Sequence, residues 1–185
     1  MAVAPRTRDV MLREAARLFA SQGFRGTSVE DIGAACGVSG PAVYKHFTGK
    51  DAILARLLVG ISEQLVEGGL QVVADASDPA RALEQLVEFH TDFALAERDV
   101  IRVQDRDLPS LNERDGARVR RLQRTYVEQW TSVLQQLEPV LSAETARLRA
   151  HAVFGLLNST PHSVRSREEA RRQLVGMALR ALRGA

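Results

Sequence analysis

The sequence has one cysteine, few aromatic residues and no long apolar run. Aromatic side chains make up 5% of its 185 residues, and the cysteine is Cys36. A single cysteine excludes a disulfide within the chain and any metal site built from several cysteines, and it fits a reducing compartment. No segment approaches the ~18 consecutive apolar residues that cross a bilayer, and the first eight residues lack the apolar stretch of a signal peptide. These absences predict a cytoplasmic protein with no membrane partner, no metal and no other cofactor.

Motifs that carry catalysis are also missing. The sequence has no glycine-rich phosphate loop, no histidine and cysteine set with metal-ligand spacing, and no nucleophile elbow. Its four histidines are scattered along the chain. The sequence therefore predicts a protein that is not an enzyme.

The sequence instead carries abundant helical periodicity. Apolar residues form 45% of the chain and charged residues 26%, and the apolar positions recur at intervals of three and four with no sustained strand-like alternation. The predicted fold is all-α, with about nine helices. They are expected at residues 6–22, 28–35 and 40–47, after Thr48, after Asp78, at 100–106, through 119–137, at 143–158 and after Ser166.

Several short motifs predict where these helices start and stop. Gly23 should end the first helix, and Thr27 to Glu30 read as a capping box in which the Thr27 hydroxyl binds the Glu30 amide. Ser39 is placed to cap the third helix and Thr48 the fourth, while the pair at 68–69, Gly-Gly, should weaken the far end of the fourth helix.

The segment from Ile32 to Phe47 has the pattern of a helix-turn-helix. Gly33 allows a close helix crossing, Gly37 permits a left-handed turn, and apolar residues on both sides would fix the crossing angle. In such a unit the second helix enters the major groove of DNA. The residues expected to face the groove are Ser39, Gly40, Pro41, Ala42, Tyr44, Lys45 and His46.

The charge of this part of the chain is compatible with a polyanion partner. Residues 1–50 hold seven Lys or Arg against four Asp or Glu, a balance of +3, whereas the whole chain carries +2. A basic N-terminal segment on a nearly neutral chain is compatible with nucleic-acid binding but does not by itself require it.

The order and spacing of certain residues in about the first fifty positions resemble those of the TetR family of ligand-responsive transcriptional repressors. The matching residues are Gly23, Thr27, Ile32, Gly37-Val38-Ser39, Tyr44-Lys45-His46-Phe47 and Lys50-Asp51. Gly33 and Cys36 stand where the family usually has alanine, and Pro41 stands where it often has glycine. These departures do not argue against DNA binding, but they mean that the operator sequence of another family member does not apply to this protein.

The resemblance implies an architecture and a set of DNA contacts. A three-helix helix-turn-helix domain is expected over residues 1–48, and a helical bundle for ligand binding and dimerisation over 49–185. By position, the resemblance gives phosphate or backbone contacts to Thr27, Tyr44, His46 and Lys50. The full set of expected DNA-binding residues is Thr27, Ser28, Ser39, Gly40, Pro41, Ala42, Tyr44, Lys45, His46 and Lys50.

The remainder of the chain should then bind an effector and a second copy. Polar or aromatic groups on inner helix faces are candidates for a mostly apolar ligand pocket: His90, Phe93, Tyr126, Trp130 and Asn158. Apolar stripes near the end of the chain are candidates for the dimer interface: Phe154, Leu157, Leu174, Ala178 and Leu182. For both sets, simple core packing within one chain is the competing interpretation.

The resulting functional hypothesis is a repressor that binds a palindromic operator of double-stranded DNA as a homodimer and leaves it when a small, largely apolar effector binds. Three arginines on one face of the seventh helix, Arg114, Arg118 and Arg121, suggest an anionic effector such as an acyl-CoA, with a solvated charged face as the plainer interpretation. The competing hypothesis is a helical adaptor that binds protein partners and uses the helix-turn-helix only as a structural corner.

Overall fold

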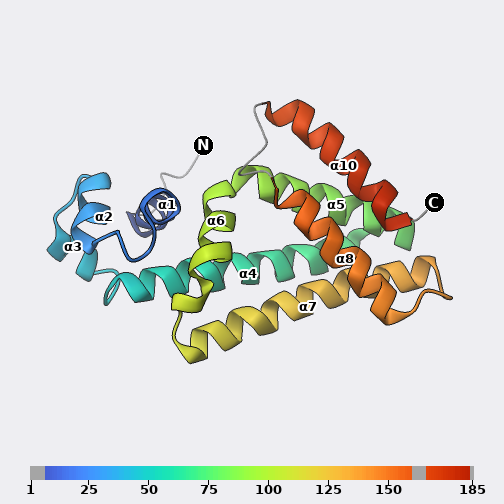
Figure 1. Ribbon diagram of the computed structural model, residues 1–185, viewed down its shortest axis with the longest axis horizontal. Helices are drawn as coiled ribbons and strands as arrows, with labels where there is room; N and C mark the ends of the chain where they lie inside the picture. Colours follow the sequence, from blue (N-terminus) through green and yellow to red (C-terminus); the bar gives the residue numbers. More distant parts are fainter. Residues whose placement is uncertain (1–6, 160–165, 184–185) are drawn as a thin grey trace. The chain divides into compact units, whose positions relative to one another are not determined.

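The structure is a computed structural model that describes residues 7–159 and 166–183. Every regular element within those ranges is helical, which confirms the predicted all-α class. The elements, shown in Figure 1, are α1 (Thr7–Gln22), α2 (Val29–Ala35), α3 (Gly40–Tyr44), α4 (Lys50–Asp75), α5 (Pro79–Ala96), α6 (Arg98–Asp107), the 3₁₀ helix η1 (Leu108–Ser110), α7 (Glu113–Leu137), α8 (Ala143–Leu157) and α10 (Arg167–Arg183).

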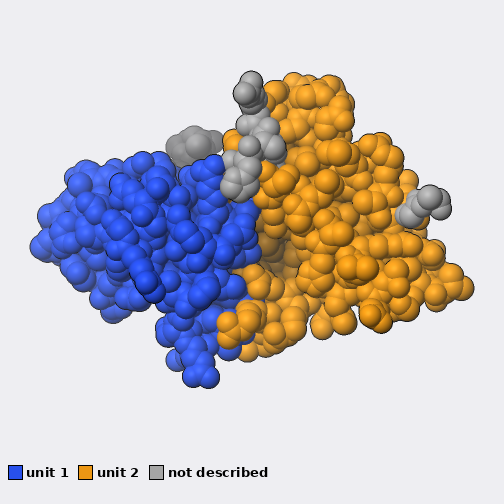
Figure 2. All heavy atoms as spheres, viewed as in Figure 1, with its two compact units in different colours: residues 1–61, 99–119 blue, residues 62–98, 120–185 orange. Residues whose placement is uncertain are grey.

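The chain divides into two compact units, coloured separately in Figure 2. Unit 1 contains residues 1–61 and 99–119, and unit 2 contains residues 62–98 and 120–185. The division falls within α4 and within α7, so each of these long helices belongs partly to one unit and partly to the other. The predicted domain boundary at residue 48 stays a prediction, since the division by contacts groups α6 with the N-terminal helices.

Unit 1 holds the helix-turn-helix. Gly23 ends α1 with a φ of 87°, and Gly37 turns between α2 and α3 with a φ of 69°; only glycine adopts such values without steric cost. Gly33 lies where α2 meets the following turn, and a Cβ atom there would lie 2.9 Å from the Val38 carbonyl oxygen. Ile32 and Val43 are fully buried beside it. The predicted roles of the three glycines are confirmed.

The predicted caps need correction at the starts of two helices. The N-cap of α2 is Ser28, whose hydroxyl accepts a hydrogen bond from the Asp31 amide, and the Asp31 carboxylate accepts one from the Ser28 amide. The capping box is therefore displaced by one residue from the predicted Thr27 and Glu30. Helix α4 begins at Lys50, and its first turn closes on the Gly49 carbonyl rather than at Thr48. Ser39 does occupy the N-cap of α3, but its side chain makes no capping hydrogen bond.

Glycines 68 and 69 do not weaken α4, which continues to Asp75. Gly69 is buried, and a Cβ atom on it would lie 2.8 Å from a ring carbon of Tyr126. A Cβ atom on Gly68 would collide with the ring of Phe89 in the same way. The prediction was wrong because the missing side chains are needed for close packing against α5 and α7, which outweighs the lower helix propensity of glycine.

The core of unit 2 lies among α5, α7, α8 and α10. Trp130, Leu83, Leu86, Leu157 and Leu182 are all fully buried in it. Helix α10 packs against both α5 and α8 (Figure 1), and Arg171 on α10 pairs with Asp92 on α5 at 2.7 Å. This ion pair is half exposed, so the apolar contacts supply most of the stabilisation.

Helix α4 is long and apolar enough to cross a membrane by length and mean hydropathy alone. Core helices of soluble proteins meet the same two criteria. Arg56, Glu63 and Glu67 interrupt the apolar sequence of α4, and charged side chains inside a bilayer are costly. Residues 50–61 of α4 belong to unit 1 and residues 62–75 to unit 2.

Candidate nucleic-acid interface and effector core

The tip of the helix-turn-helix is exposed. Ser39, Pro41, Tyr44, Lys45 and His46 all lie at the surface, and 53% of the Tyr44 area is accessible. A tyrosine that packs in a core is largely buried, so the exposure of Tyr44 argues against a core-packing role. Val43 and Phe47 point the other way and are buried. The structure thus separates an outward face of α3, which carries the predicted DNA-binding residues, from an inward face that holds the unit together.

A surface hollow of about 490 Å³ adjoins this tip. Four of the predicted DNA-binding residues line it together: Thr27, Ser28, Tyr44 and Lys50. Sequence reasoning missed Arg25, which also lines the hollow and is exposed. The only hint in the sequence was its place in the basic N-terminal region, just before the Thr27-Ser28 pair.

Three of these four side chains already have partners inside unit 1. Thr27 is 1% exposed, and its hydroxyl donates to the Gly23 carbonyl at 2.9 Å. The Lys50 ammonium donates to the carbonyls of the α1–α2 connection. Ser28 is half buried, and its hydroxyl donates to Asp31 at 2.6 Å, which lowers the pKa of that carboxyl. Tyr44 is the one of the four whose side chain stands clear of the fold.

The five predicted ligand-pocket residues come together in unit 2. His90 is 3% exposed and lies among four aromatic rings. Its ring centroid is 5.6 Å from that of Phe93, 5.7 Å from Tyr126, 6.0 Å from Trp130 and 4.9 Å from Phe154. Asn158, the C-cap of α8, completes the group. We call these six residues the aromatic cluster. Phe154, which is predicted for dimer contact and is half buried, also belongs to this cluster.

Hydrogen bonds join three members of the aromatic cluster into a chain. His90 Nε2 lies 3.1 Å from the Asn158 Oδ1 atom, and His90 Nδ1 lies 3.3 Å from the Tyr126 hydroxyl. A neutral imidazole satisfies both contacts when Nε2 donates to Asn158 and Nδ1 accepts from Tyr126. Burial lowers the pKa of His90 to about 4 and raises that of Tyr126 above its usual range. The cluster is therefore uncharged at neutral pH.

The buried, neutral His90 makes stability depend on pH. Between pH 6.5 and 4 the unfolded chain binds a proton at this position that the folded chain excludes, so acidification favours unfolding. The depressed pKa predicts a loss of about 3 kcal/mol from this residue as the pH falls from 7 to below 4. Urea unfolding of the wild type and of His90→Gln at several pH values measures it. We expect the stability difference between the two proteins to change by that amount, and a constant difference would contradict the assignment.

One polar atom in the aromatic cluster is poorly satisfied. The Trp130 Nε1–H group lies beside the Tyr126 hydroxyl but makes no hydrogen bond of good geometry to any described residue, and the whole side chain is fully buried. Leaving a buried donor unsatisfied costs about 1–3 kcal/mol. Such an atom is what a site that receives a hydrogen-bond acceptor would contain.

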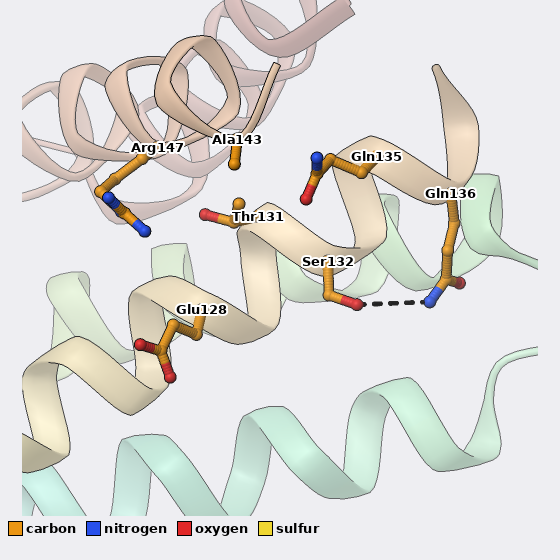
Figure 3. A pocket seen from close by; sticks show the side chains of 7 residues that line it. All are labelled: Glu128, Thr131, Ser132, Gln135, Gln136, Ala143 and Arg147. Atoms are coloured by element: carbon orange, nitrogen blue, oxygen red, sulfur yellow. Dashed lines mark hydrogen bonds between the residues drawn. The ribbon is translucent and has the colours of Figure 1, made fainter. Parts of the chain in front are cut away.

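A second hollow, of about 420 Å³, lies between α7 and the start of α8 (Figure 3). Its lining is polar and includes Glu128 and Arg147 from the two helices, and Gln136 donates to Ser132 at 3.4 Å. None of the predicted ligand-pocket residues lines it. This hollow and the aromatic cluster are separate features of unit 2.

The predicted dimer residues lie mainly inside the chain. Leu157, Leu174, Ala178 and Leu182 are buried in the core of unit 2, so their side chains form no outer surface. The outward faces carry other apolar or small residues: Leu148, Ala152 and Gly155 on α8, and Met177 and Ala181 on α10. The predicted stripe faces the core. Spacing alone does not distinguish the two faces, because buried and exposed apolar stripes repeat with the same period along a helix.

Comparison with known proteins agrees with this architecture. The model of the bacterial regulatory proteins of the TetR family matches residues 11–57, and the model of the tetracyclin repressor-like C-terminal domain matches residues 76–182. The HTH-type transcriptional repressor KstR2 of Rhodococcus jostii is 30% identical over 69% of this chain, and the match spans 63% of its own length, a little under two thirds.

Solved structures show the same fold. A TetR-family transcriptional regulator from Bordetella parapertussis superposes with a TM-score of 0.84 at 27% identity, over 95% of both chains. AibR, solved in complex with isovaleryl coenzyme A and operator DNA, superposes with a TM-score of 0.74 at 21% identity, over 93% of this chain and 97% of that one. The two family models together cover both units, and their order along the chain matches the helix-turn-helix followed by the helical body. The chain belongs to the TetR family of DNA-binding transcriptional regulators, which are not enzymes.

Proposed function

We propose that this protein is a transcriptional repressor that binds a palindromic operator as a homodimer and is released by a small, largely uncharged effector. The observation that carries the proposal is the exposed face of α3 and of the residues that flank it, where Ser39, Tyr44, Lys45 and His46 stand clear of a buried inner face. An adaptor that used the helix-turn-helix only as a corner would need no such exposed polar tip. The site of action would be the cytoplasm, where the chromosome lies.

In this proposal the tip residues divide by role. Gly40, Pro41 and Ala42 are small and lie at the start of α3, so they let the helix backbone approach base edges, with Ser39 ahead of them. Tyr44, Lys45 and His46 reach backbone phosphates. Arg25, which is exposed at the neighbouring hollow, extends the phosphate contacts toward α2, whereas the Ser28 hydroxyl is already bonded to Asp31.

Selection from a random pool of duplexes tests the proposal and requires no known operator. The wild type should enrich a palindromic sequence, and gel retardation on that duplex should weaken as salt increases. Enrichment of no sequence would support the adaptor hypothesis instead.

Replacement of Lys45 gives a quantitative prediction for this duplex. Removal of one phosphate-binding cation reduces the slope of log affinity against log salt by about 1, and the substitution removes one from each protomer of the dimer. We therefore expect Lys45→Met to flatten the slope by about 2 and to weaken binding at every sequence alike. An unchanged slope would mean that Lys45 does not bind phosphate.

For the effector, we propose that binding takes place at the aromatic cluster, whose packed side chains move apart to admit it. Its members provide stacking surfaces, a poorly satisfied indole N–H and an amide, and they include no charged side chain. An isolated charge would be costly to bury there, so the part of the effector that enters is uncharged and apolar, with a hydrogen-bond acceptor for Trp130. Trp130 is the only tryptophan of the chain, so its fluorescence reports directly on occupancy.

A conservative pair of variants tests the effector site. Trp130→Phe and Asn158→Ala should leave operator affinity within twofold of the wild type but weaken release by the effector about tenfold, because each removes one hydrogen bond to it. The measurement is gel retardation with increasing effector, using any compound that releases the wild type. Release unchanged in both variants would place the effector elsewhere.

An acyl-CoA is a second candidate for the effector. The structural relative AibR was solved with isovaleryl coenzyme A, and in this chain Arg121 and Arg124 are exposed on the unit 2 part of α7. Their guanidinium groups suit phosphate oxygens. Calorimetry with acyl-CoA compounds of increasing chain length tests the idea, and no heat at any length would exclude it.

For the dimer, we propose that the outward faces of α8 and α10 meet their counterparts in a second copy. Leu148 is 68% exposed and Met177 is 38% exposed, and a side chain added at Gly155 would meet nothing within 4 Å. Small residues between larger apolar ones allow two helices to approach closely.

A further inference from the structure

Two cationic side chains from outside the three-helix motif hold the end of α1 and the connection that leads from it to α2. Lys50, from α4, and Arg106, from α6, donate to five backbone carbonyls between residues 19 and 27. All these groups belong to unit 1. The same connection leads directly into the hollow beside the α3 tip.

The donor capacity of Lys50 is used up within the fold. Its ammonium donates to the carbonyls of Phe24 at 3.0 Å, Thr27 at 3.1 Å and Arg25 at 3.4 Å. An ammonium has three protons, so each has an acceptor. The nitrogen also lies 4.8 Å from the centroid of the Phe24 ring, over its face. A phosphate could reach this ammonium only by displacing one of these carbonyls.

Arg106 closes the C-terminal end of α1. One terminal nitrogen donates to the Phe19 carbonyl, and the other lies 3.4 Å from the Ala20 carbonyl. These carbonyls lie in the last turn of α1, where the helix dipole favours a cation. Asp107, which is buried, accepts from the Arg106 guanidinium at 2.9 and 3.1 Å and fixes its plane.

We propose that Lys50 and Arg106 are positioning residues for operator binding, that Lys50 fixes the α1–α2 connection and Arg106 the last turn of α1 that leads into it, so that the groups around the hollow face DNA, and that neither contacts a phosphate. This inference rests on the proposed operator binding. It reverses the expectation, drawn from the resemblance, that Lys50 clamps DNA directly. Because α6 also contributes, the orientation of the DNA-reading face depends on a residue more than eighty positions away from the end of α1 in the sequence.

The salt dependence of operator affinity separates the two roles. The probe is the duplex enriched by the wild type, and the proteins are Lys50→Met, Lys50→Arg, Arg106→Lys and, as the matched control, Lys45→Met. We expect Lys50→Met and Arg106→Lys to weaken binding about tenfold at every salt concentration with an unchanged slope, since the number of neutralised phosphates stays the same. Lys45→Met should flatten the slope.

The charge-conserving variants strengthen the test. A planar guanidinium cannot direct single protons to three converging carbonyls as an ammonium does, so Lys50→Arg should remain as weak as Lys50→Met. Rescue by arginine, or a slope flattened by about 2 in Lys50→Met, would show that Lys50 binds phosphate and would overturn the inference for that residue. A flattened slope in Arg106→Lys would do the same for Arg106.

Amide hydrogen exchange on the free proteins gives a readout that does not involve DNA. Exchange of the amides at 23–28 should be faster in Lys50→Met and Arg106→Lys than in the wild type, and unchanged in Lys45→Met. Equal protection in all four proteins would contradict the positioning role. If the wild type itself enriches no duplex, the proposed function fails, whereas the exchange result still decides whether the two cations hold the connection.

Discussion

Replacement of Trp130 by alanine is expected to lower the free energy of unfolding by about 3–5 kcal/mol, the range for removal of a fully buried large aromatic side chain. Trp130 is 0% exposed and makes edge contacts with the rings of His90, Tyr126 and Phe154. Removal of the indole leaves a cavity among these three rings, and the surrounding helices relax only partly into such a space. Urea unfolding at a fixed protomer concentration measures the loss of stability.

Two controls make this result specific. Trp130→Phe keeps a ring in place and removes the poorly satisfied N–H group, so its loss of stability should be less than half of that for alanine. Val140→Ala, at a residue that is 91% exposed, should change stability by no more than about 0.5 kcal/mol. A loss below about 1 kcal/mol for Trp130→Ala would mean that the aromatic cluster is not a packed core.

Replacement of Gly33 by valine is expected to reduce operator affinity at least a hundredfold. A Cβ atom at this position would lie 2.9 Å from the Val38 carbonyl oxygen and 3.3 Å from the Gly40 amide nitrogen. Both contacts are backbone atoms. The alanine usual in the family requires only a small adjustment, but the two additional methyl groups of valine require α3 to move away from α2. Since α3 carries the groups that face the groove, the displacement should disrupt every base contact at once. Gel retardation on the enriched duplex measures it.

Ala34→Val is the matched control for this variant. It places the same side chain on the neighbouring residue of α2, which is exposed and meets no such restriction. We expect the helix content of unit 1 to fall in Gly33→Val and to be retained in Ala34→Val, as measured by circular dichroism. Operator affinity of Gly33→Val within threefold of the wild type would show that the close crossing of α2 and α3 is not needed for DNA binding.

The sequence alone predicted the features that depend on local apolar periodicity and on residues that end helices. Helix class follows from the three-and-four spacing, and the glycines at 23 and 37 marked turns because a positive φ is unfavourable for other residues. The sequence also placed His90, Tyr126 and Trp130 on inner helix faces, and all three are buried, whereas their role in a ligand pocket stays a prediction.

Features that depend on which helix meets which were not foreseen. The Lys50 ammonium and the Arg106 guanidinium bind carbonyls that are more than twenty and more than eighty residues distant in the sequence, and no local pattern records such contacts. The glycines at 68 and 69 looked like helix breakers because the rings of Phe89 and Tyr126 against them belong to other helices. Thr27 and Ser28 are adjacent and both suit an N-cap, so the sequence did not distinguish them. In the structure the Thr27 hydroxyl points inward and donates to the Gly23 carbonyl, and Ser28 caps α2.

The central claim is that two copies of the chain present exposed α3 tips to the two halves of one operator. The most direct test is the mass of the protein–DNA complex, measured by sedimentation on the enriched duplex and on the same duplex with one half scrambled. We predict two protomers on the intact palindrome and loss of that complex when one half is scrambled. A complex of one protomer per duplex, or equal binding to both duplexes, would contradict the central claim.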